Sequence, residues 1–220
     1  MPDWEQIATR AESRYRDGEA RLPSDRDARQ RQLTRMGNAA GAAALSLLMA
    51  GDADGARTWF ERAADRYRES YGDAPEGSWG RPIGALKAHV LGENWDAAAH
   101  DARWALDEGA ALAESPIGRY AAALAYLVLG HWEEARVVAD GLRTHAGFPT
   151  DVADALAYIA GDDPLGYTEA VESVLASFET RDEYLEDVPV ADTVLVLQAI
   201  ARRRDIDIPP LASDLLPSAQ

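Results

Sequence analysis

The sequence predicts an all-α protein: an α-solenoid of about four helix pairs with a helical extension before them and a capping helix after them. Three observations support this. Alanine is prominent among the hydrophobic residues, which make up 47% of the 220 residues, and alanine favours closely packed helices. Signals for helix starts and helix ends recur along the chain. Four segments also share one pattern, in which a helix ends, a short polar turn follows and a second helix begins.

Residues 1–36 predict the N-terminal helical extension. Asp3 is a suitable N-cap for a helix over residues 3–21, because its side chain can accept a hydrogen bond from the first turn. The sequence SDRD at 24–27 then starts a second helix that reaches Ala50. Two glycines in this second helix leave room for a bend.

Residues 37–187 contain the recurring pattern. When the four copies are aligned, one alanine follows each turn at the same distance: Ala56, Ala98, Ala135 and Ala170. Small or apolar residues recur four and seven positions later, so we expect one face of each second helix to be buried. Two of the preceding helices begin alike, with Pro82 and Pro116 in their first turns.

These residues resemble the tetratricopeptide repeat, a helix–turn–helix unit of about 34 residues. The resemblance covers roughly residues 37–178. It rests on the turn and second-helix positions, namely Gly51, Asp52, Trp95, Trp132, Tyr167 and the aligned alanines. It implies helix pairs that stack side by side, with the first helix of each pair lining a concave groove. The chain departs from the repeat at the usual glycine of the first helix, and its repeat ends are longer.

The whole chain also resembles uncharacterised acidic proteins of salt-adapted archaea. This likeness rests on the segments ESPIGRYAAAL and VPVADTVLVLQ and on basic side chains that are almost all arginine. The group implies no known activity.

Residues 188–220 predict a C-terminal capping helix and tail, because a solenoid needs an atypical element to cover its last exposed face. The acidic residues 179–187 before it lack the alternating ligands and central glycine of a calcium loop, so they predict a solvated linker. Together the three parts are expected to form a single compact domain.

The formal net charge of −16 comes from 38 acidic and 22 basic residues, of which Lys87 is the only lysine. Such a balance argues against a nucleic-acid partner. Two interpretations stay open: the acidity is a solvated, halophilic coat for high salt, or it is a surface for a basic partner.

Thiolate chemistry is excluded because the chain contains no cysteine. The N-terminus has no apolar signal core, and no segment approaches the roughly 18 apolar residues of a membrane span. We therefore expect a cytoplasmic protein without a membrane partner.

The stretch LGHWEEA places His131 beside Glu133 and Glu134, but no second histidine stands at metal-ligand spacing. The aligned ENWDA has no histidine at all, so the shared feature is a tryptophan that begins a repeat helix. Phosphate-binding loops, dinucleotide fingerprints and nucleophile elbows are also absent from the sequence. The sequence thus predicts no catalytic residue, no metal and no cofactor.

The loop EGSWGRPIG at 76–84 is the strongest candidate for partner contact, since tryptophan and arginine dominate binding hot spots. The alternative is a tryptophan that packs onto the neighbouring repeat. With the polar residues expected in the groove, the predicted partner-binding set is Trp79, Arg81, Lys87, Arg119 and Tyr120.

The resulting functional hypothesis is a non-catalytic protein–protein interaction module that binds an unidentified protein or peptide. The expected groove residues are Leu45, Met49, Lys87, Val90, Tyr120, Leu124 and Val128, which are largely apolar. Either the groove receives an amphipathic helix or peptide, or the N-terminal helices fold back and fill it. The alternative function is a small-ligand-binding protein or enzyme with a site around Trp79, Arg81 and Lys87, which a closed pocket of about 300–1,000 Å³ would favour. An immunity-type or antitoxin role rests only on the small acidic helical form.

Overall fold

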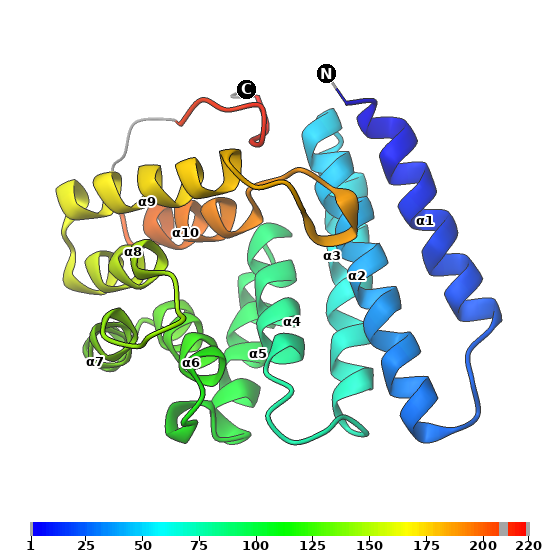
Figure 1. The fold of residues 1–220 in the computed structure, drawn as a ribbon, viewed down its shortest axis with the longest axis horizontal. Helices are drawn as coiled ribbons and strands as arrows, with labels where there is room; N and C mark the ends of the chain where they lie inside the picture. The colour runs from blue at the N-terminus through cyan, green and yellow to red at the C-terminus, as the bar shows by residue number, and fades with distance from the viewer. Residues whose placement is uncertain (1, 207–210, 219–220) are drawn as a thin grey trace.

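A computed structural model describes residues 2–206 and 211–218. These residues form ten α-helices and two short 3₁₀ turns and contain no strand, which confirms the predicted all-α class (Figure 1). The elements are α1 (Trp4–Ala20), α2 (Arg26–Ala50), α3 (Ala53–Tyr71), α4 (Gly80–Leu91), α5 (Trp95–Asp107), η1 (Ala110–Leu112), α6 (Pro116–Leu129), α7 (Trp132–Arg143), α8 (Thr150–Gly161), α9 (Pro164–Glu179), η2 (Leu185–Asp187) and α10 (Asp192–Arg203).

The helices begin where short polar side chains can cap them. An N-cap side chain accepts a hydrogen bond from a backbone N–H of the first turn at Asp3, Asp25, Asp52, Asn94, Ser115 and Asp163. Asp3 caps α1 as expected, and Pro82 and Pro116 both lie in first helical turns. The helix that follows SDRD is continuous from Arg26 to Ala50, so the expected boundary between residues 36 and 37 lies inside α2.

The four tight turns between paired helices share one backbone feature. Each contains one residue with positive φ, which reverses the chain direction within a few residues. These residues are Gly51, Glu93, Gly130 and Asp162. Two of the four turns thus adopt the left-handed backbone conformation at a residue other than glycine, namely Glu93 and Asp162.

Each turn joins two packed helices, giving the pairs α2–α3, α4–α5, α6–α7 and α8–α9. The aligned alanines Ala56, Ala98, Ala135 and Ala170 are all buried on their second helices. The residues four positions later, Phe60, Ala102, Ala139 and Val174, are buried as well. The expected buried face of each second helix is therefore present.

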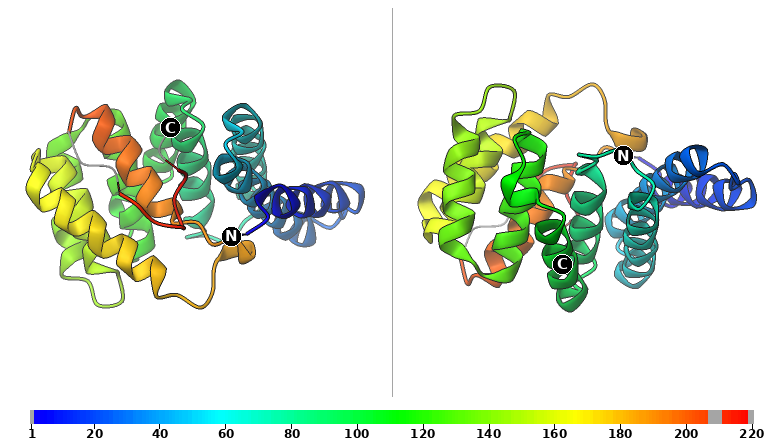
Figure 2. Two further views of the ribbon diagram at one scale, coloured as in Figure 1. Left: turned by 90° about the horizontal axis from the view of Figure 1, so that it is seen from above. Right: turned by 90° about the horizontal axis from the view of Figure 1, so that it is seen from below.

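The C-terminal segment turns back across the first helices of the pairs. After α9, residues 180–191, here called the strap, lead into α10, which packs against α8, α9 and α4 (Figure 2). At its C-terminal end Arg203 stacks on Trp95 and Arg204 on Trp132, the first residues of α5 and α7. α10 thus contacts helices of several pairs, and two of the three arginines at its C-terminal end stack on tryptophans of α5 and α7.

The N-terminal helix α1 lies along α2, on the side away from α10 (Figure 1). The C-terminal segment therefore covers part of the expected groove, while Leu45 and Lys87 line the cleft. Val90 and Leu124 are fully buried in the same core as Val194 and Leu197 of α10.

The buried apolar side chains form two cores. The first core is built mainly by α1, α2 and α3, and also contains Ala85 and Ala88 of α4 and Val188 and Val190 of the strap. The second core extends from α4 to α10. Helix α4 contributes to both cores, so it lies at the seam between them.

Within the described ranges, none of the helices combines the length and the apolar character that crossing a bilayer requires.

Candidate functional site

A cleft of about 380 Å³ lies at the seam between the two cores. Its walls are the facing sides of α2 and α4, its floor is formed by residues of α3, and the strap closes part of its mouth. Such a volume falls within the range of small-ligand sites. The cleft is therefore the candidate functional site.

The floor of the cleft is set by Tyr67 of α3. A Cβ atom on Gly37 of α2 would lie 2.9 Å from the Tyr67 ring, and one on Gly84 of α4 would lie 2.7 Å from it. The two glycines therefore admit the ring between α2 and α4. The Tyr67 hydroxyl donates to Asn38 Oδ1 at 2.8 Å. Burial raises the pKa of Tyr67 well above its usual value, and the carboxylates of Asp192 and Glu186 add to this.

The Arg81 guanidinium lies at one end of the cleft. Its Nε donates to Ser70 Oγ at 3.1 Å and its Nη2 to Gln30 Oε1 at 2.5 Å. Both acceptors are neutral, and burial lowers the pKa of Arg81, with only Tyr71 acting against this. Thr34 and Asn38 line the same end of the cleft from α2. This end is polar and positively charged.

The middle of the cleft contains an ion pair between Lys87 and Asp192, the first residue of α10, with Nζ and Oδ2 2.5 Å apart. Burial acts to lower the pKa of Lys87, but Asp192 and the Tyr120 hydroxyl outweigh it and raise the pKa. Lys87 also donates to the Thr193 hydroxyl at 3.3 Å. The pair neutralises the chain's only lysine and fastens the start of α10 to α4.

The cleft's other end is apolar. It is lined by Leu45 of α2, Phe60 of α3 and Leu91 of α4. Between this end and the polar end lies Gly41, at which a Cβ atom would meet no other atom within 4 Å. The backbone of α2 is therefore exposed to the interior of the cleft at this point.

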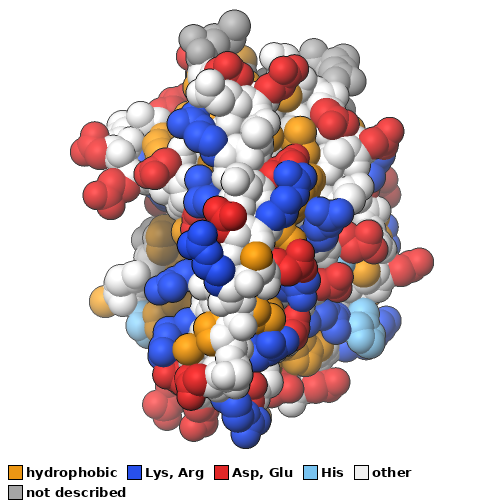
Figure 3. Space-filling model, turned by 90° about the vertical axis from the view of Figure 1, so that its right-hand side faces the viewer, with side chains coloured by type: hydrophobic (Ala, Val, Ile, Leu, Met, Phe, Trp, Pro, Cys, Tyr) orange, Lys and Arg blue, Asp and Glu red, His pale blue; other side chains and the backbone are white. Residues whose placement is uncertain are grey.

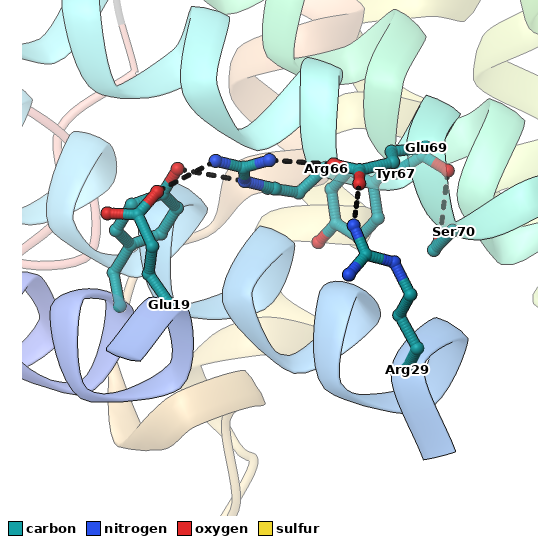
Figure 4. Close-up of polar contacts among 7 residues, drawn as sticks. Glu19, Arg29, Arg66, Tyr67, Glu69 and Ser70 are labelled. Carbon is teal, nitrogen blue, oxygen red and sulfur yellow. Dashed lines mark hydrogen bonds and ion pairs between the residues drawn. The ribbon is translucent and has the colours of Figure 1, made fainter. Parts of the chain in front are cut away.

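The wall formed by α2 is tied to its neighbours by charged side chains (Figure 4). Arg66 of α3 donates to Glu19 and to the Tyr15 hydroxyl of α1, and also contacts Glu69. Arg29 of α2 donates to the same Glu69 at 2.7 Å. Burial acts to raise the pKa of Glu69, but its bonds to Arg66 and Arg29 outweigh it and lower the pKa. The network links α1, α2 and α3 behind the cleft.

The surface formed by α1 and its neighbours, on the side away from the cleft, is not uniformly basic. In Figure 3, which shows the side carrying α1, arginine side chains alternate with acidic ones. Arg16 pairs with Glu12 on α1, and Arg14 pairs with Glu186 of the strap at 3.3 Å. The paired arginines of the N-terminal segment thus serve in local ion pairs, in contacts with acids of or just after α3, and in attaching the strap.

The five residues predicted for partner contact do not form one site. Arg81 and Lys87 line the cleft, and Tyr120 lies behind Lys87. Trp79 is only 9% exposed and packs in the second core, where its Nε1 lies 2.8 Å from the Cβ position of Gly118. Arg119 donates to the Ala113 carbonyl at 3.3 Å and does not line the cleft. Trp79 therefore occupies the packing position that was the alternative to partner contact.

Sequence reasoning missed the cleft residues of α2, namely Thr34, Asn38 and Gly41, and it missed Tyr67. The available signal was the pair of glycines at positions 37 and 41, which had suggested a bend. In the structure one glycine makes room for Tyr67 and the other faces the cleft. Residues 179–187, expected to be a solvated linker, are mostly exposed, although Tyr184 and Glu186 line the cleft. The buried Val188 and Val190 of the strap belong to the segment that was predicted as the cap.

The histidine with the strongest polar contact lies outside the cleft. Nδ1 of His89 in α4 is 2.6 Å from Oδ2 of Asp101 in α5, and Arg68 of α3 pairs with the other oxygen. All three side chains serve to join helices, and Asp101 is fully buried. His131 stands at the exposed start of α7, stacked on Tyr126. Across the described ranges, no three histidine or acidic side chains gather as a metal site.

Comparisons of this chain with models of protein families, with curated proteins and with solved structures found no match.

Proposed function

We propose that this chain is a non-catalytic binding protein whose site is the cleft between α2, α4 and the strap. The observation that carries the proposal is the coverage of the groove. α10 packs on α4, α8 and α9, and the strap lines the mouth of the cleft, so these two segments lie where an extended peptide would bind and leave a cleft of about 380 Å³. A space of this size suits a small ligand better than a long peptide.

The proposal includes the architecture. We propose that α2 to α9 are four tetratricopeptide-like helix pairs, and that α10 packs across their first helices. The buried alanines at matching positions and the shared turn geometry support this. The cleft would then form where the first two pairs stack less closely than the others.

The side chains around the cleft support binding rather than catalysis. Among the described lining residues there is no serine, cysteine or histidine. Two of the lining carboxylates are engaged, Asp192 with Lys87 and Glu186 with Arg14. The lining therefore lacks a serine or cysteine nucleophile beside a histidine base, and, against the effect of burial, Asp192 raises the pKa of Lys87 and so keeps its amine protonated.

A single substitution tests whether the cleft is the site. Gly41→Phe places a ring in open space on the cleft wall, so the chain is expected to fold and the cleft to be filled. The matched control is Gly161→Phe, because Gly161 is exposed at the end of α8 and a Cβ atom there also meets nothing within 4 Å.

The readout is native mass spectrometry of wild type and both variants after each is incubated with extract of the producing cells. We expect a compound or short peptide that wild type and Gly161→Phe retain and Gly41→Phe loses. Equal retention by all three proteins, or retention of nothing by the wild type, would refute the cleft as the binding site.

A further inference from the structure

Three features of the cleft are unusual: the guanidinium of Arg81, the glycine at position 41, and a lining that changes from polar to apolar along the length of the cleft. Several arginines near the first core are paired with acids, Arg26 with Asp73 and both Arg29 and Arg66 with Glu69, and the unpaired Arg35 and Arg62 are exposed to solvent. Arg81 differs from them. Within the described residues no carboxylate lies at ion-pair distance from it, and its two bonds go to a hydroxyl and an amide oxygen. Its charge therefore has no partner of opposite sign in the described structure. Arg181 of the strap also lines the cleft without an ion pair among the described residues, but it is exposed to solvent and stacks on Phe178.

A half-buried cation without an anion is costly, because neutral acceptors replace only part of the hydration that burial removes. The chain has 38 acidic residues from which a partner could have been supplied. Nη1 of Arg81 makes no bond within the described residues, and the Arg81 side chain lines the cleft. An anionic group in the cleft would complete the coordination of this guanidinium and form a charge-assisted hydrogen bond.

Gly41 gives the second observation. Glycine inside a helix costs about 1 kcal/mol relative to alanine, so it is normally explained by a close neighbour. Gly18, Gly37 and Gly84 have such neighbours, each with an atom within 3.0 Å of the Cβ position. Gly41 has none, although it lies in the middle of the 25-residue helix α2. The protein's own packing does not explain this glycine, but a ligand that lies against the α2 backbone would.

The third observation is the direction of the cleft. From Thr34 to Leu45 the α2 wall covers roughly 17 Å, at about 1.5 Å for each residue. Arg81 bonds to Gln30, one turn before Thr34, and the opposite end is lined by Leu45, Phe60 and Leu91. A ligand that satisfies both ends has a charged head and a hydrocarbon body.

We propose that the cleft binds a small amphipathic carboxylate, with its head on Arg81 and its hydrocarbon body along Gly41 toward Leu45 and Leu91. This inference rests on the proposed binding function and names its ligand class. The strap carries Glu183 and Glu186 at the rim, of which Glu186 is paired with Arg14. The carboxylate head is placed on Arg81 because this half-buried cation has no acidic partner among the described residues, and Val188 and Val190 add apolar lining for the body.

The test uses decanoate and its uncharged counterpart decanol as probes, with affinities measured by isothermal titration calorimetry on the full chain. Wild type is expected to bind decanoate more tightly than decanol. Arg81→Gln should weaken decanoate binding about tenfold or more and leave decanol nearly unchanged, since only the charge-assisted bond is lost. Arg81→Lys retains the charge and should keep most of the preference for decanoate.

Two controls separate charge in the cleft from charge elsewhere and from folding. Arg136→Gln removes one exposed positive charge on α7, away from the cleft lining and from the network behind it, and should leave both affinities unchanged. Gly41→Phe should abolish binding of both probes, with its urea unfolding curve showing that it is folded.

Several outcomes would overturn the inference. They are no binding of decanoate by wild type at millimolar concentration, equal affinity for decanoate and decanol, or a preference for decanoate that Arg81→Gln retains. If Gly41→Phe loses a compound from extract that proves neutral or cationic, the binding function stands and the carboxylate assignment fails. If it loses nothing, the binding function itself fails.

Discussion

Helix α4 has a close-packed junction with α6 and an open one with α2. On the α6 side, Leu86 and Val90 of α4 and Leu124 of α6 are at most 1% exposed and belong to one apolar core. On the α2 side, the Tyr67 ring enters between two glycines and the cleft lies beside it. Similar helix pairs therefore give either a filled core or a cleft, depending on where large side chains and glycines stand.

The seam between the two cores is held by polar contacts as well as by packing. Arg68 of α3, His89 of α4 and Asp101 of α5 meet in a buried cluster, and the Arg68 guanidinium also stacks on Trp104 at 5.2 Å. Lys87 of α4 pairs with Asp192 at the start of α10, directly after the strap. Both contacts keep α4 in position between the cores, and the shape of the cleft depends on them.

The largest effect is expected from Asp101→Ala. Removal of the buried carboxylate leaves Arg68 and His89 without their partner, so the free energy of unfolding should fall by about 3–5 kcal/mol. Urea denaturation followed by circular dichroism measures this change. Asp140→Ala, which removes an exposed acid paired with Arg143, should change stability by less than about 1 kcal/mol. A similar small loss for both variants would show that the seam does not depend on Asp101.

At the open junction, Gly84→Ala is expected to cost about 1–3 kcal/mol. Its Cβ would lie 2.7 Å from the Tyr67 ring, and a ring held between two helices can move only if the helices part. The same urea experiment measures the loss. A neutral or stabilising effect would mean that α2 and α4 can move apart at little cost in free energy.

A third prediction compares Tyr67 with Tyr167 of the second core. Burial raises the pKa of both hydroxyls. Each group is neutral in both states at pH 7. Above about pH 10 the unfolded chain ionises and the folded chain does not, so stability is lost as pH rises, by up to about 1.4 kcal/mol per unit and group.

Replacing either tyrosine by phenylalanine should reduce this loss between about pH 10 and 11. At pH 7 the two variants should differ. Tyr67→Phe should cost about 1 kcal/mol because Asn38 loses its donor. Tyr167→Phe should cost less, because its hydroxyl makes no hydrogen bond within the described residues. Urea unfolding of both variants and the wild type, at pH 7 and at pH 10 to 11, measures these changes in stability. Equal costs for the two variants at pH 7 would contradict the expected difference between the two hydroxyls.

The smallest effect is expected from Gly41→Ala, the matched control for Gly84→Ala. Both changes add one methyl group inside a helix, but at Gly41 the methyl enters open space. Helix propensity should then stabilise the protein by about 0.5–1 kcal/mol. Destabilisation would show that the cleft wall is more crowded than the structure indicates.

The sequence by itself determined the helices and their buried faces. Caps such as Asp3 and Ser115 and the prolines in first turns act within a few residues, and the spacing of Ala56, Phe60 and Ala63 already shows which side is buried. Of the predicted binding residues, Arg81 and Lys87 line the cleft. Arg81 was predicted because tryptophan and arginine dominate binding hot spots, and Lys87 because its spacing from the aligned alanines places it on the groove side of its helix. These signals are local, so they can be recognised without knowing what the helix packs against.

Only the tertiary structure decided where the C-terminal segment lies, and with it the candidate site. Nothing local distinguishes an α10 that caps the stack from one that crosses it, because the choice depends on apolar surface supplied by α4, α8 and α9 together. The same holds for Trp79, whose burial depends on Gly118, about forty residues later. Glycines at 37 and 41 look alike in sequence, and only the positions of Tyr67 and the strap give one a packing role and leave the other facing the cleft.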